Sequence, residues 1–242
     1  MLLLPITRED LLKYLPKGGT VAEIGVLQGD FSKLILKHAA PARLHLIDPW
    51  VHQDREDYAH DPANRVDAEH DRLFRKVQKT FGRRIKKGEV TLHRDFSTNV
   101  TPSFDDGYFD WVYIDGLHTR EGVANDLGQF DPKLKEGGLI LGHDFTNQDN
   151  AREMNFGVVE AVEEFVGRTA YEFLAMTLEM FPTFLLAKDG QSELVAAMIE
   201  RLILDIPGVV EIRDYPGRTY RHKTYTLEGR RGRAKTRVVP SF

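Results

Sequence analysis

Short apolar runs rich in β-branched residues recur along the first two-thirds of the chain, and longer segments with helical spacing separate them. A parallel sheet with crossover helices gives this pattern, because its strands are buried on both faces. The later runs 173–178 and 183–187 are too close together for a crossover helix, so they are predicted to form an antiparallel hairpin. The predicted parallel strands are residues 20–24, 43–47, 89–93, 109–114 and 139–142.

The segments between these runs have the spacing of amphipathic helices. Asp30 is the expected N-cap of a helix that begins at Phe31. Further helices are predicted at 63–81, 123–134 and 158–165. The buried side of the first is expected to carry Val66, Leu73, Phe74, Val77 and Phe81. One face of the second is expected to carry Val123, Leu127, Phe130 and Leu134.

These elements predict an α/β protein with a Rossmann-like, seven-stranded, mostly parallel sheet that ends in an antiparallel hairpin and has helices on both faces. Residues 1–190 are expected to form this domain. The charged stretch 49–88 is long for a crossover and is a candidate insertion or lid. Residues 191–242 are expected to form a C-terminal extension, with a helix near its start and two strand-like runs, 209–212 and 219–227, that could pair with each other.

Composition excludes several classes of protein. The 242 residues are 41% hydrophobic and 29% charged, as in globular proteins, and the absence of cysteine excludes disulfides, thiolate nucleophiles and cysteine-based zinc sites. The apolar start is interrupted by Arg8, Glu9 and Asp10, so it is too short for the central region of a signal peptide. We expect a cytoplasmic protein with no membrane span.

The charge is unevenly distributed. The chain carries a net charge of −4, but residues 213–242 hold nine Lys or Arg against Asp214 and Glu228, a local charge of +7. This basic end could bind phosphates, dock on the acidic remainder of the chain or on a second subunit, or be a solvated tail.

Each predicted parallel strand ends at or just before an acidic residue: Glu23, Asp48, Asp95, Asp115 and Asp144. Ligands of open α/β sheets bind at the carboxyl ends of the strands, where these side chains would gather. Neighbouring carboxylates repel one another unless hydroxyl donors, ammonium groups or metal cations satisfy them. The edge therefore predicts a site for a positively charged ligand.

The turn after the first of these strands narrows the choice. Glu23, Gly25 and Gly29 form E-x-G-x-x-x-G, which is not the dinucleotide-binding pattern G-x-G-x-x-G, and the chain contains no P-loop sequence. A carboxylate at Glu23 would oppose a pyrophosphate but could receive an ammonium group. A tight strand-to-helix turn is the structural alternative for these residues.

With these motifs the chain resembles the class I S-adenosylmethionine-dependent methyltransferases, over about residues 21–188. The resemblance implies that Glu23, Gly25 and Gly29 hold the methionine end of the cofactor and that Asp48 accepts both ribose hydroxyls. It also implies that Asp95, Phe96 and Ser97 bracket the adenine, with Asp115 at the same site. Asp95 and Ser97 could instead be loop formers that bond their own backbone.

The segments Phe109-Asp110-Trp111-Val112-Tyr113-Ile114-Asp115-Gly116-Leu117-His118 and Gly137-Gly138-Leu139-Ile140-Leu141-Gly142-His143-Asp144 resemble bacterial O-methyltransferases of the macrocin type and of methyltransferase domain 24. In that branch an Asp after the fourth strand and an acidic pair after the fifth bind a divalent metal. The resemblance implies Asp115, His143 and Asp144 as ligands of Mg²⁺ or a similar cation. His143 departs from the acidic pair, which favours a site with one imidazole ligand.

A neutral hydroxyl needs a general base, a metal or both to become a nucleophile. His118 lies three residues after Asp115, and we predict that it is the base and that Asp115 acts with it in catalysis. The predicted function is methyl transfer from S-adenosylmethionine to the hydroxyl of a small molecule. The alternatives are a nucleic-acid methyltransferase that uses the basic end, and a non-catalytic nucleotide-binding protein.

Other residues are open to two interpretations. Trp50 could cover the adenine or the acceptor, or could be packing, and His52, His60 and His70 have spacing too loose to predict a metal site. Asp115 and Asp144 could be a turn residue and a helix cap. The sequence leaves the oligomeric state open, a homo-oligomer included.

Overall fold

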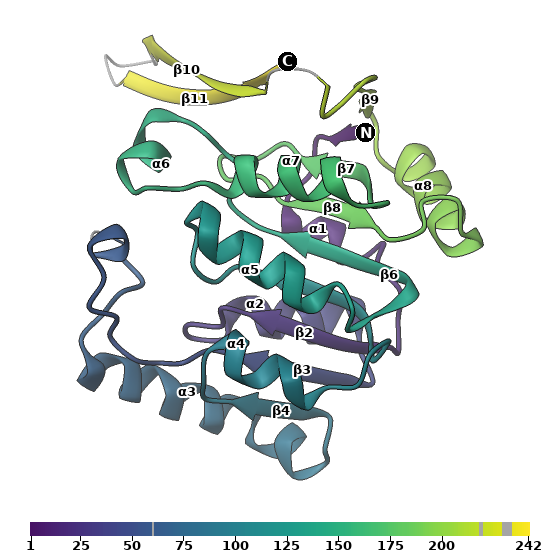
Figure 1. The fold of residues 1–242 in the computed structure, drawn as a ribbon. Helices are drawn as coiled ribbons and strands as arrows, with labels where there is room; N and C mark the ends of the chain where they lie inside the picture. The colour runs from purple at the N-terminus through teal and green to yellow at the C-terminus, as the bar shows by residue number, and fades with distance from the viewer. Residues whose placement is uncertain (60, 218–219, 229–233) are drawn as a thin grey trace.

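A nine-stranded sheet forms the centre of the protein (Figure 1). The structure is a computed structural model, and it describes residues 1–59, 61–217, 220–228 and 234–242. The strand order is β4-β3-β2-β5-β6-β8-β7-β1-β9. Within it, the first five strands are parallel, and β8 is antiparallel to both of its neighbours. These seven strands confirm the predicted fold. Their bounds are β2 (Thr20–Ile24), β3 (Arg43–Ile47), β4 (Val90–His93), β5 (Phe109–Ile114), β6 (Leu134–Gly142), β7 (Glu172–Thr177) and β8 (Phe184–Ala187).

Two further strands extend the hairpin edge of the sheet: one at the N-terminus, which the sequence did not predict, and one within the predicted strand-like run 209–212. β1 (Leu2–Leu4) pairs in parallel with β7, and β9 (Val210–Glu211) pairs antiparallel with β1. The prediction of seven strands was therefore too low, because β7 has a free edge and the apolar N-terminus covers it. Leu4 is fully buried there.

Helices cover both faces of the sheet, each over its own apolar core. On one face, buried side chains come from α1 (Arg8–Leu11), α2 (Asp30–Leu34) with the π-helical turn η1 (Ile35–Ala39), α3 (Asp67–Lys86) and α8 (Glu193–Asp205). On the other they come from α4 (Ser97–Val100), α5 (Arg120–Phe130) and α7 (Val158–Arg168). The short elements η2 (Glu56–Tyr58), η3 (Thr101–Ser103) and α6 (Asp149–Glu153) complete the described helices.

Three details of the helix predictions were wrong. Gly29, with φ of 76°, is the N-cap of α2, and the Asp30 carboxylate instead binds Lys33 at 2.7 Å. Val66 is 61% exposed, because α3 begins only after it. Leu134 belongs to β6 and not to α5.

The stretch 49–88 divides into two parts. Residues 67–86 are the crossover helix α3, which buries Leu73, Val77 and Phe81 against the sheet. Only residues 49–66 lie outside the regular crossover, and they contain η2. The lid candidate is therefore this shorter loop, because the apolar side of α3 holds the rest in the core.

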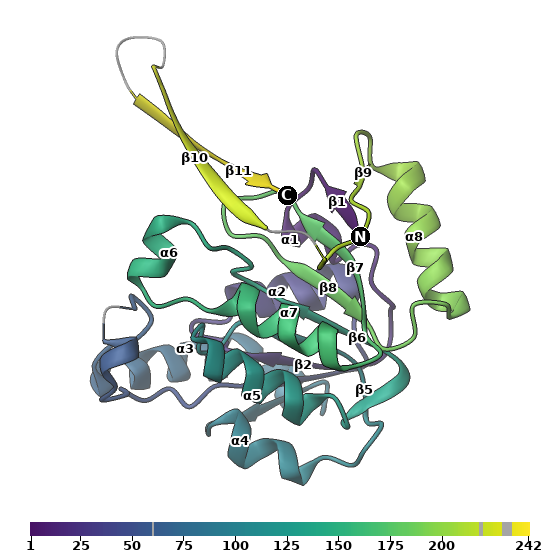
Figure 2. The same ribbon diagram turned by 45° about the horizontal axis from the view of Figure 1, so that its top comes forward.

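The C-terminal region contains a separate two-stranded sheet that projects from the rest of the structure (Figure 2). Its strands are β10 (Arg221–Glu228) and β11 (Ala234–Ser241). The expected pairing of 209–212 with 219–227 was wrong, since β9 pairs with β1 and β10 pairs with β11; β11 is too polar to be predicted as a strand. Residue 219 and the basic residues Arg218, Arg230, Arg231 and Arg233 lie outside the described residues.

The base of this hairpin is packed on the body and is not a solvated tail. Tyr220 is 3% exposed and donates to the carbonyl oxygen of Phe145 at 3.2 Å. Asn147 donates to the carbonyl of Tyr220 at 2.8 Å and accepts from the backbone N–H of His222 at 2.9 Å. The hairpin is therefore anchored on the loop that follows β6.

Within the described part of the chain, none of the helices combines the length and the apolar character needed to cross a lipid bilayer.

Candidate active site

A cavity of about 490 Å³ lies at the carboxyl ends of β2, β3 and β5. Seven of the predicted site residues line it: Glu23, Gly25, Asp48, Phe96, Ser97, Asp115 and His118. The parallel strands bring these residues together because all of them end at one edge of the sheet. The volume of the cavity is within the range of small-molecule and cofactor sites.

Glu23 is a buried carboxylate at the end of β2. It is 1% exposed, and its Oε2 atom has no hydrogen-bond partner among the described residues. Burial raises the pKa of Glu23 to about 8, because the charged form loses its hydration. A carboxylate in this position is suited to a cationic ligand, which would satisfy the free oxygen and stabilise the charged form.

Gly25 shapes the wall of the cavity beside Glu23. Its φ is 85°, and a Cβ atom at this position would lie 2.0 Å from the carbonyl oxygen of Asp115. The turn after β2 can therefore pass against the end of β5 only with glycine here. Gly29 does not line the cavity, but its positive φ allows the turn to enter α2, and it packs against Phe81.

Asp48 connects the ends of two strands. Its Oδ2 accepts from the backbone N–H groups of Val26 and Leu27, both at 2.9 Å, and its Oδ1 accepts from that of Trp50 at 2.7 Å. Burial raises the pKa of Asp48 although these three hydrogen bonds oppose the shift. Asp48 therefore fixes the turn after β2 and also faces the cavity.

His70, which the sequence did not single out as a ligand, lines the cavity from α3. It is 6% exposed, and neither of its ring nitrogens has a hydrogen-bond partner among the described residues. Buried polar atoms are normally paired, so a polar ligand in the cavity would satisfy them. Only the packing of α3 across the sheet brings His70 to this site.

The structure separates Asp95 from its predicted neighbours Phe96 and Ser97. The Asp95 carboxylate is exposed and accepts from the backbone N–H of Phe96 and the side chain of Asn99, both at 2.7 Å, so it shapes a local turn and does not line the cavity. Ser97 instead donates to Asp126 at 2.6 Å. Asp126 is a buried side chain of α5 that lines the cavity, and burial raises its pKa to about 6.

Asp115, His118 and Asp144 form a cluster at one wall of the cavity. One ligand atom from each lies within 4.8 Å of the others, which would allow the three side chains to share a metal ion. The His118 Nε2 atom is 3.0 Å from Asp144 Oδ2 and 3.5 Å from Asp115 Oδ1. Two carboxylates and one imidazole suit a divalent cation such as Mn²⁺ or Mg²⁺.

His143, the predicted imidazole ligand, lies beside this cluster but outside the group of three. Its Nδ1 atom is 3.1 Å from Asp144 Oδ1 and 3.6 Å from Asp115 Oδ1. Burial alone would lower the pKa of His143, but the charges of Asp115 and Asp144 outweigh it and raise the pKa to about 9. His143 therefore also lies close to both carboxylates, and its role as a metal ligand stays a prediction.

His118 lies between carboxylates on both sides. Besides Asp115 and Asp144 it contacts Asp61, whose Oδ2 is 3.3 Å from Nδ1. Burial alone would lower the pKa of His118, but its close contacts with the three carboxylates outweigh this effect and hold the pKa well above its ordinary value. The predicted role as a general base stays a prediction, and it requires that the imidazole first loses its proton.

Arg8 is a cationic neighbour of this cluster that sequence reasoning missed. It reaches the site from α1, and its Nη1 donates to Asp115 Oδ2 and to the Tyr113 hydroxyl, both at 3.0 Å. The guanidinium also lies over the ring of Phe31. Arg8 therefore occupies one oxygen of Asp115 and leaves the other, Oδ1, facing the two histidines.

Trp50 and His52 do not reach the cluster. Trp50 is fully buried, donates to the carbonyl of Leu27 at 2.7 Å and packs on Phe74, so it is a core residue. His52 contacts the carbonyl of Arg65. His60 lies outside the described residues.

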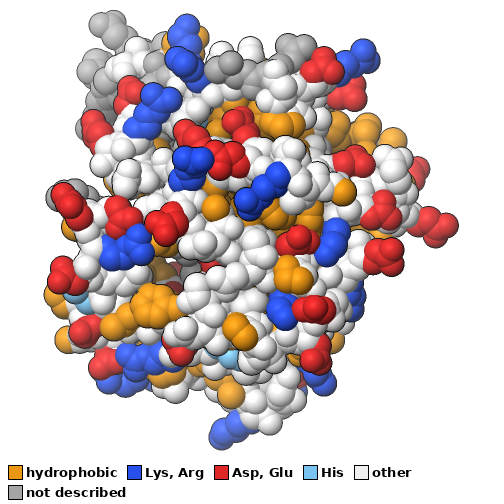
Figure 3. Space-filling model, viewed as in Figure 1, with side chains coloured by type: hydrophobic (Ala, Val, Ile, Leu, Met, Phe, Trp, Pro, Cys, Tyr) orange, Lys and Arg blue, Asp and Glu red, His pale blue; other side chains and the backbone are white. Residues whose placement is uncertain are grey.

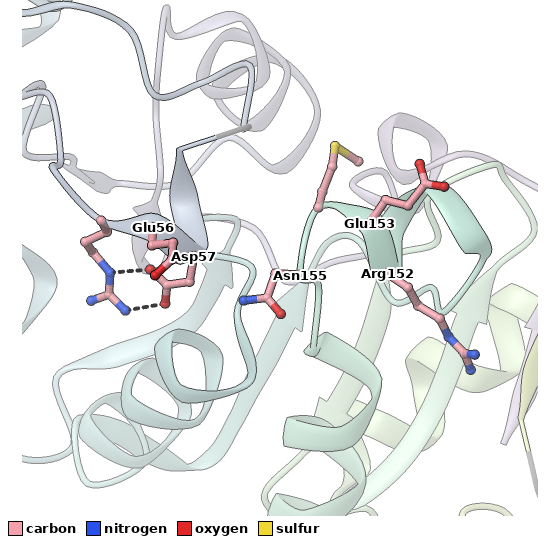
Figure 4. A pocket seen from close by; sticks show the side chains of 7 residues that line it. Glu56, Asp57, Arg152, Glu153 and Asn155 are labelled. Carbon is pink, nitrogen blue, oxygen red and sulfur yellow. Dashed lines mark hydrogen bonds and ion pairs between the residues drawn. The ribbon is translucent and has the colours of Figure 1, made fainter.

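Figure 4 shows a second hollow, of about 660 Å³. Arg55, Glu56 and Asp57 line one side, and residues 152–155 line the other. Arg55 lines both this hollow and the cavity at the strand ends, and the ring of Phe156, which follows residue 155, packs on the His118 imidazole at 4.6 Å between ring centroids. On the face shown in Figure 3 the surface is hollowed at the left, and both acidic and basic side chains surround the hollow.

A family model described as a methyltransferase domain matches residues 22–145, from β2 to just after Asp144. The chain belongs to this methyltransferase family. The matched segment contains the cavity's strand ends and the whole Asp115–His118–Asp144 cluster. The protein is therefore an S-adenosylmethionine-dependent methyltransferase with a Rossmann-like fold. A comparison with curated protein sequences found no match.

Solved structures agree with this fold. N-methyltransferase NodS from Bradyrhizobium japonicum is 12% identical, with a TM-score of 0.51 over 74% of this chain and 92% of that chain. A candidate rRNA methylase from Clostridium thermocellum is 16% identical, with a TM-score of 0.51 over 74% and 94%. A candidate methyltransferase from Streptococcus mutans, solved with S-adenosylhomocysteine, is 9% identical, with a TM-score of 0.50 over 74% and 94%. At these identities the likeness shows the fold alone.

Proposed function

We propose that this methyltransferase transfers the methyl group of S-adenosylmethionine to a hydroxyl group of a small polar molecule. The observation that carries the proposal is the Asp115–His118–Asp144 cluster at the wall of the cofactor cavity. A neutral hydroxyl must lose its proton as it attacks, and carboxylates with an imidazole are the groups that support this loss.

The cavity offers a partner for each part of the cofactor. The free Oε2 of Glu23 is placed to bind the ammonium group, beside the close turn at Gly25. Asp48 and His70 are the candidates for the ribose hydroxyls, since both line the same part of the cavity wall. Phe96 and Ser97, with Asp126 behind Ser97, would then meet the adenine.

In the reaction the acceptor oxygen forms a bond to the methyl carbon while the bond from that carbon to the sulfonium sulfur breaks. The sulfur keeps the bonding electron pair and becomes a neutral thioether, and the hydroxyl proton passes to the neutral imidazole of His118. Because the methyl donor is already activated, alignment of the oxygen is the main requirement. The second hollow, between residues 55–57 and 152–155, is a candidate site for a polar acceptor because charged side chains line it and Arg55 borders both hollows.

Asp115 and Asp144 would hold a divalent cation, which when bound lowers the pKa of a hydroxyl oxygen, and His118 would remain free to accept the proton. The chain's own groups define the surroundings of that oxygen. Arg8 fixes one oxygen of Asp115, and the backbone N–H of Gly157 donates to the carbonyl of His118 at 2.9 Å, which holds the histidine loop in place.

The test is a search for acceptors with S-adenosylmethionine that carries a labelled methyl group. We expect methylated hydroxyl products from small polar acceptors with Mg²⁺ or Mn²⁺ present, and less product after addition of a chelator. D115N and D144N should lose turnover, and D205N, a matched change at an exposed site on α8, should not. Methylation of RNA or of amines only would contradict the proposal, as would cofactor binding without turnover on any acceptor.

A further inference from the structure

Both ring nitrogens of His118 face carboxylates, but these come from different parts of the chain. Nε2 faces the cluster residues Asp115 and Asp144, which end β5 and β6. Nδ1 faces Asp61 at 3.3 Å, which lies 57 residues earlier in the sequence. A partner on one nitrogen of an imidazole fixes the ring and so decides where the other nitrogen points.

Asp61 is held in the orientation that this contact needs. Its Oδ1 accepts from the backbone N–H of Ala63 at 2.7 Å, and its own N–H donates to the carbonyl of Tyr58 at 3.1 Å. These bonds leave Oδ2 for His118. The Asp61 side chain is only 7% exposed, so the contact with His118 is shielded from water.

The loop that carries Asp61 is closed on itself. Asn64 accepts from the backbone N–H of Gln53 and donates to its carbonyl, both at 2.9 Å, so the two ends of the loop are tied together. Gln53, Arg55 and Tyr58 of the same loop line the cofactor cavity, and Arg55 also lines the second hollow. One loop thus lines the cavity at the strand ends, borders the second hollow and contacts His118.

We propose that Asp61 is a positioning residue that aims His118 Nε2 at the reacting oxygen. The inference rests on the proposed function.

The first test compares D61A, D61N and D61E with D54N, a matched change at an exposed position of the same loop. Loss of the orienting carboxylate should lower kcat by about 10- to 100-fold in D61A, as for other partners of site histidines. The acceptor KM and the S-adenosylhomocysteine Kd should change less than twofold, and D61E should recover part of kcat. D54N should behave as wild type.

A merely structural role for Asp61 predicts a different result. S-adenosylhomocysteine affinity and Tm would then fall together with kcat in D61A, and D61E would not recover activity. Either that pattern or wild-type kcat in D61A would overturn the proposal.

The second test does not need turnover. Nitrogen NMR of ¹⁵N-histidine-labelled protein, saturated with S-adenosylhomocysteine, should show the His118 ring signals moved in D61A and unchanged in D54N. Unmoved His118 signals in D61A would contradict the role of Asp61. If the His118 signals move in D61A but the wild-type enzyme methylates no hydroxyl acceptor, the proposed function is contradicted instead. The two failures are therefore distinguishable.

Discussion

Replacement of Glu23 with Gln tests the electrostatics of the cofactor cavity. Burial raises the pKa of Glu23 from an ordinary value of 4.5 to about 8, so the folded protein binds this proton more tightly than the unfolded chain does. The resulting stabilisation is complete below pH 4.5 and is lost as the pH rises through 8. At about 1.4 kcal/mol per pH unit, the whole effect is roughly 5 kcal/mol.

The E23Q variant has no proton to lose, so its stability should not contain this slope. We expect the unfolding free energy of E23Q to rise relative to that of wild type by several kcal/mol between pH 5 and pH 8. Urea unfolding at pH 5, 6, 7 and 8 measures this difference, and other titrating groups cancel because both proteins contain them. E200Q, a matched change at an exposed position of α8, should follow the wild-type curve.

The same substitution should weaken cofactor binding. Loss of a charge-assisted hydrogen bond to the ammonium group costs about 1.5–3 kcal/mol, or roughly 10- to 150-fold in the Kd of S-adenosylhomocysteine. Because burial keeps the pKa of Glu23 above neutral pH, the side chain is mostly protonated at pH 7, and binding of the ammonium group should release a proton. Calorimetry in buffers of different ionisation enthalpy measures that release.

Two results would refute this reasoning. Parallel stability curves for E23Q and wild type would show that the pKa of Glu23 is not raised in the folded protein. Equal affinities with no proton release would show that Glu23 does not meet the ammonium group. The second result would leave the fold intact and remove Glu23 from the cofactor site.

Three further changes test separate parts of the site. G25A should destabilise the protein by more than about 3 kcal/mol or prevent folding, because the new Cβ would overlap the Asp115 carbonyl at a positive φ. The control G128A adds a Cβ that meets nothing within 4 Å in α5 and should stabilise the protein by about 0.5–1 kcal/mol, so equal urea midpoints for the two variants would contradict this prediction. D48A should weaken the binding of S-adenosylhomocysteine at least tenfold, about 1.4 kcal/mol, and an unchanged affinity in calorimetry would remove the ribose assignment. It should also lower the unfolding free energy by about 2 kcal/mol or more, since three backbone N–H groups lose their acceptor. H70F should weaken the binding of the same ligand several-fold without lowering Tm, because it removes two unpaired buried nitrogens. A lower Tm with unchanged affinity would instead show that His70 is a structural residue.

The sequence by itself determined the central sheet and much of the cavity. Strands buried on both faces need nearly continuous apolar runs, so β2, β3 and β5 could be predicted to the residue. Parallel strands end at one edge, so the residues that follow them had to gather there. Glu23, Gly25, Asp48 and Asp115 therefore line the cavity, as predicted.

Only the tertiary structure decided which other side chains reach that edge. Asp61, His70 and Arg8 come from a loop, a long helix and the N-terminal turn, and no sequence spacing relates them to the strand ends. Asp95 shows the reverse case, since it follows a strand but turns toward its own backbone. Periodicity determines which face of an element is buried, whereas the direction of a loop side chain depends on contacts between distant segments, which form only when the chain folds.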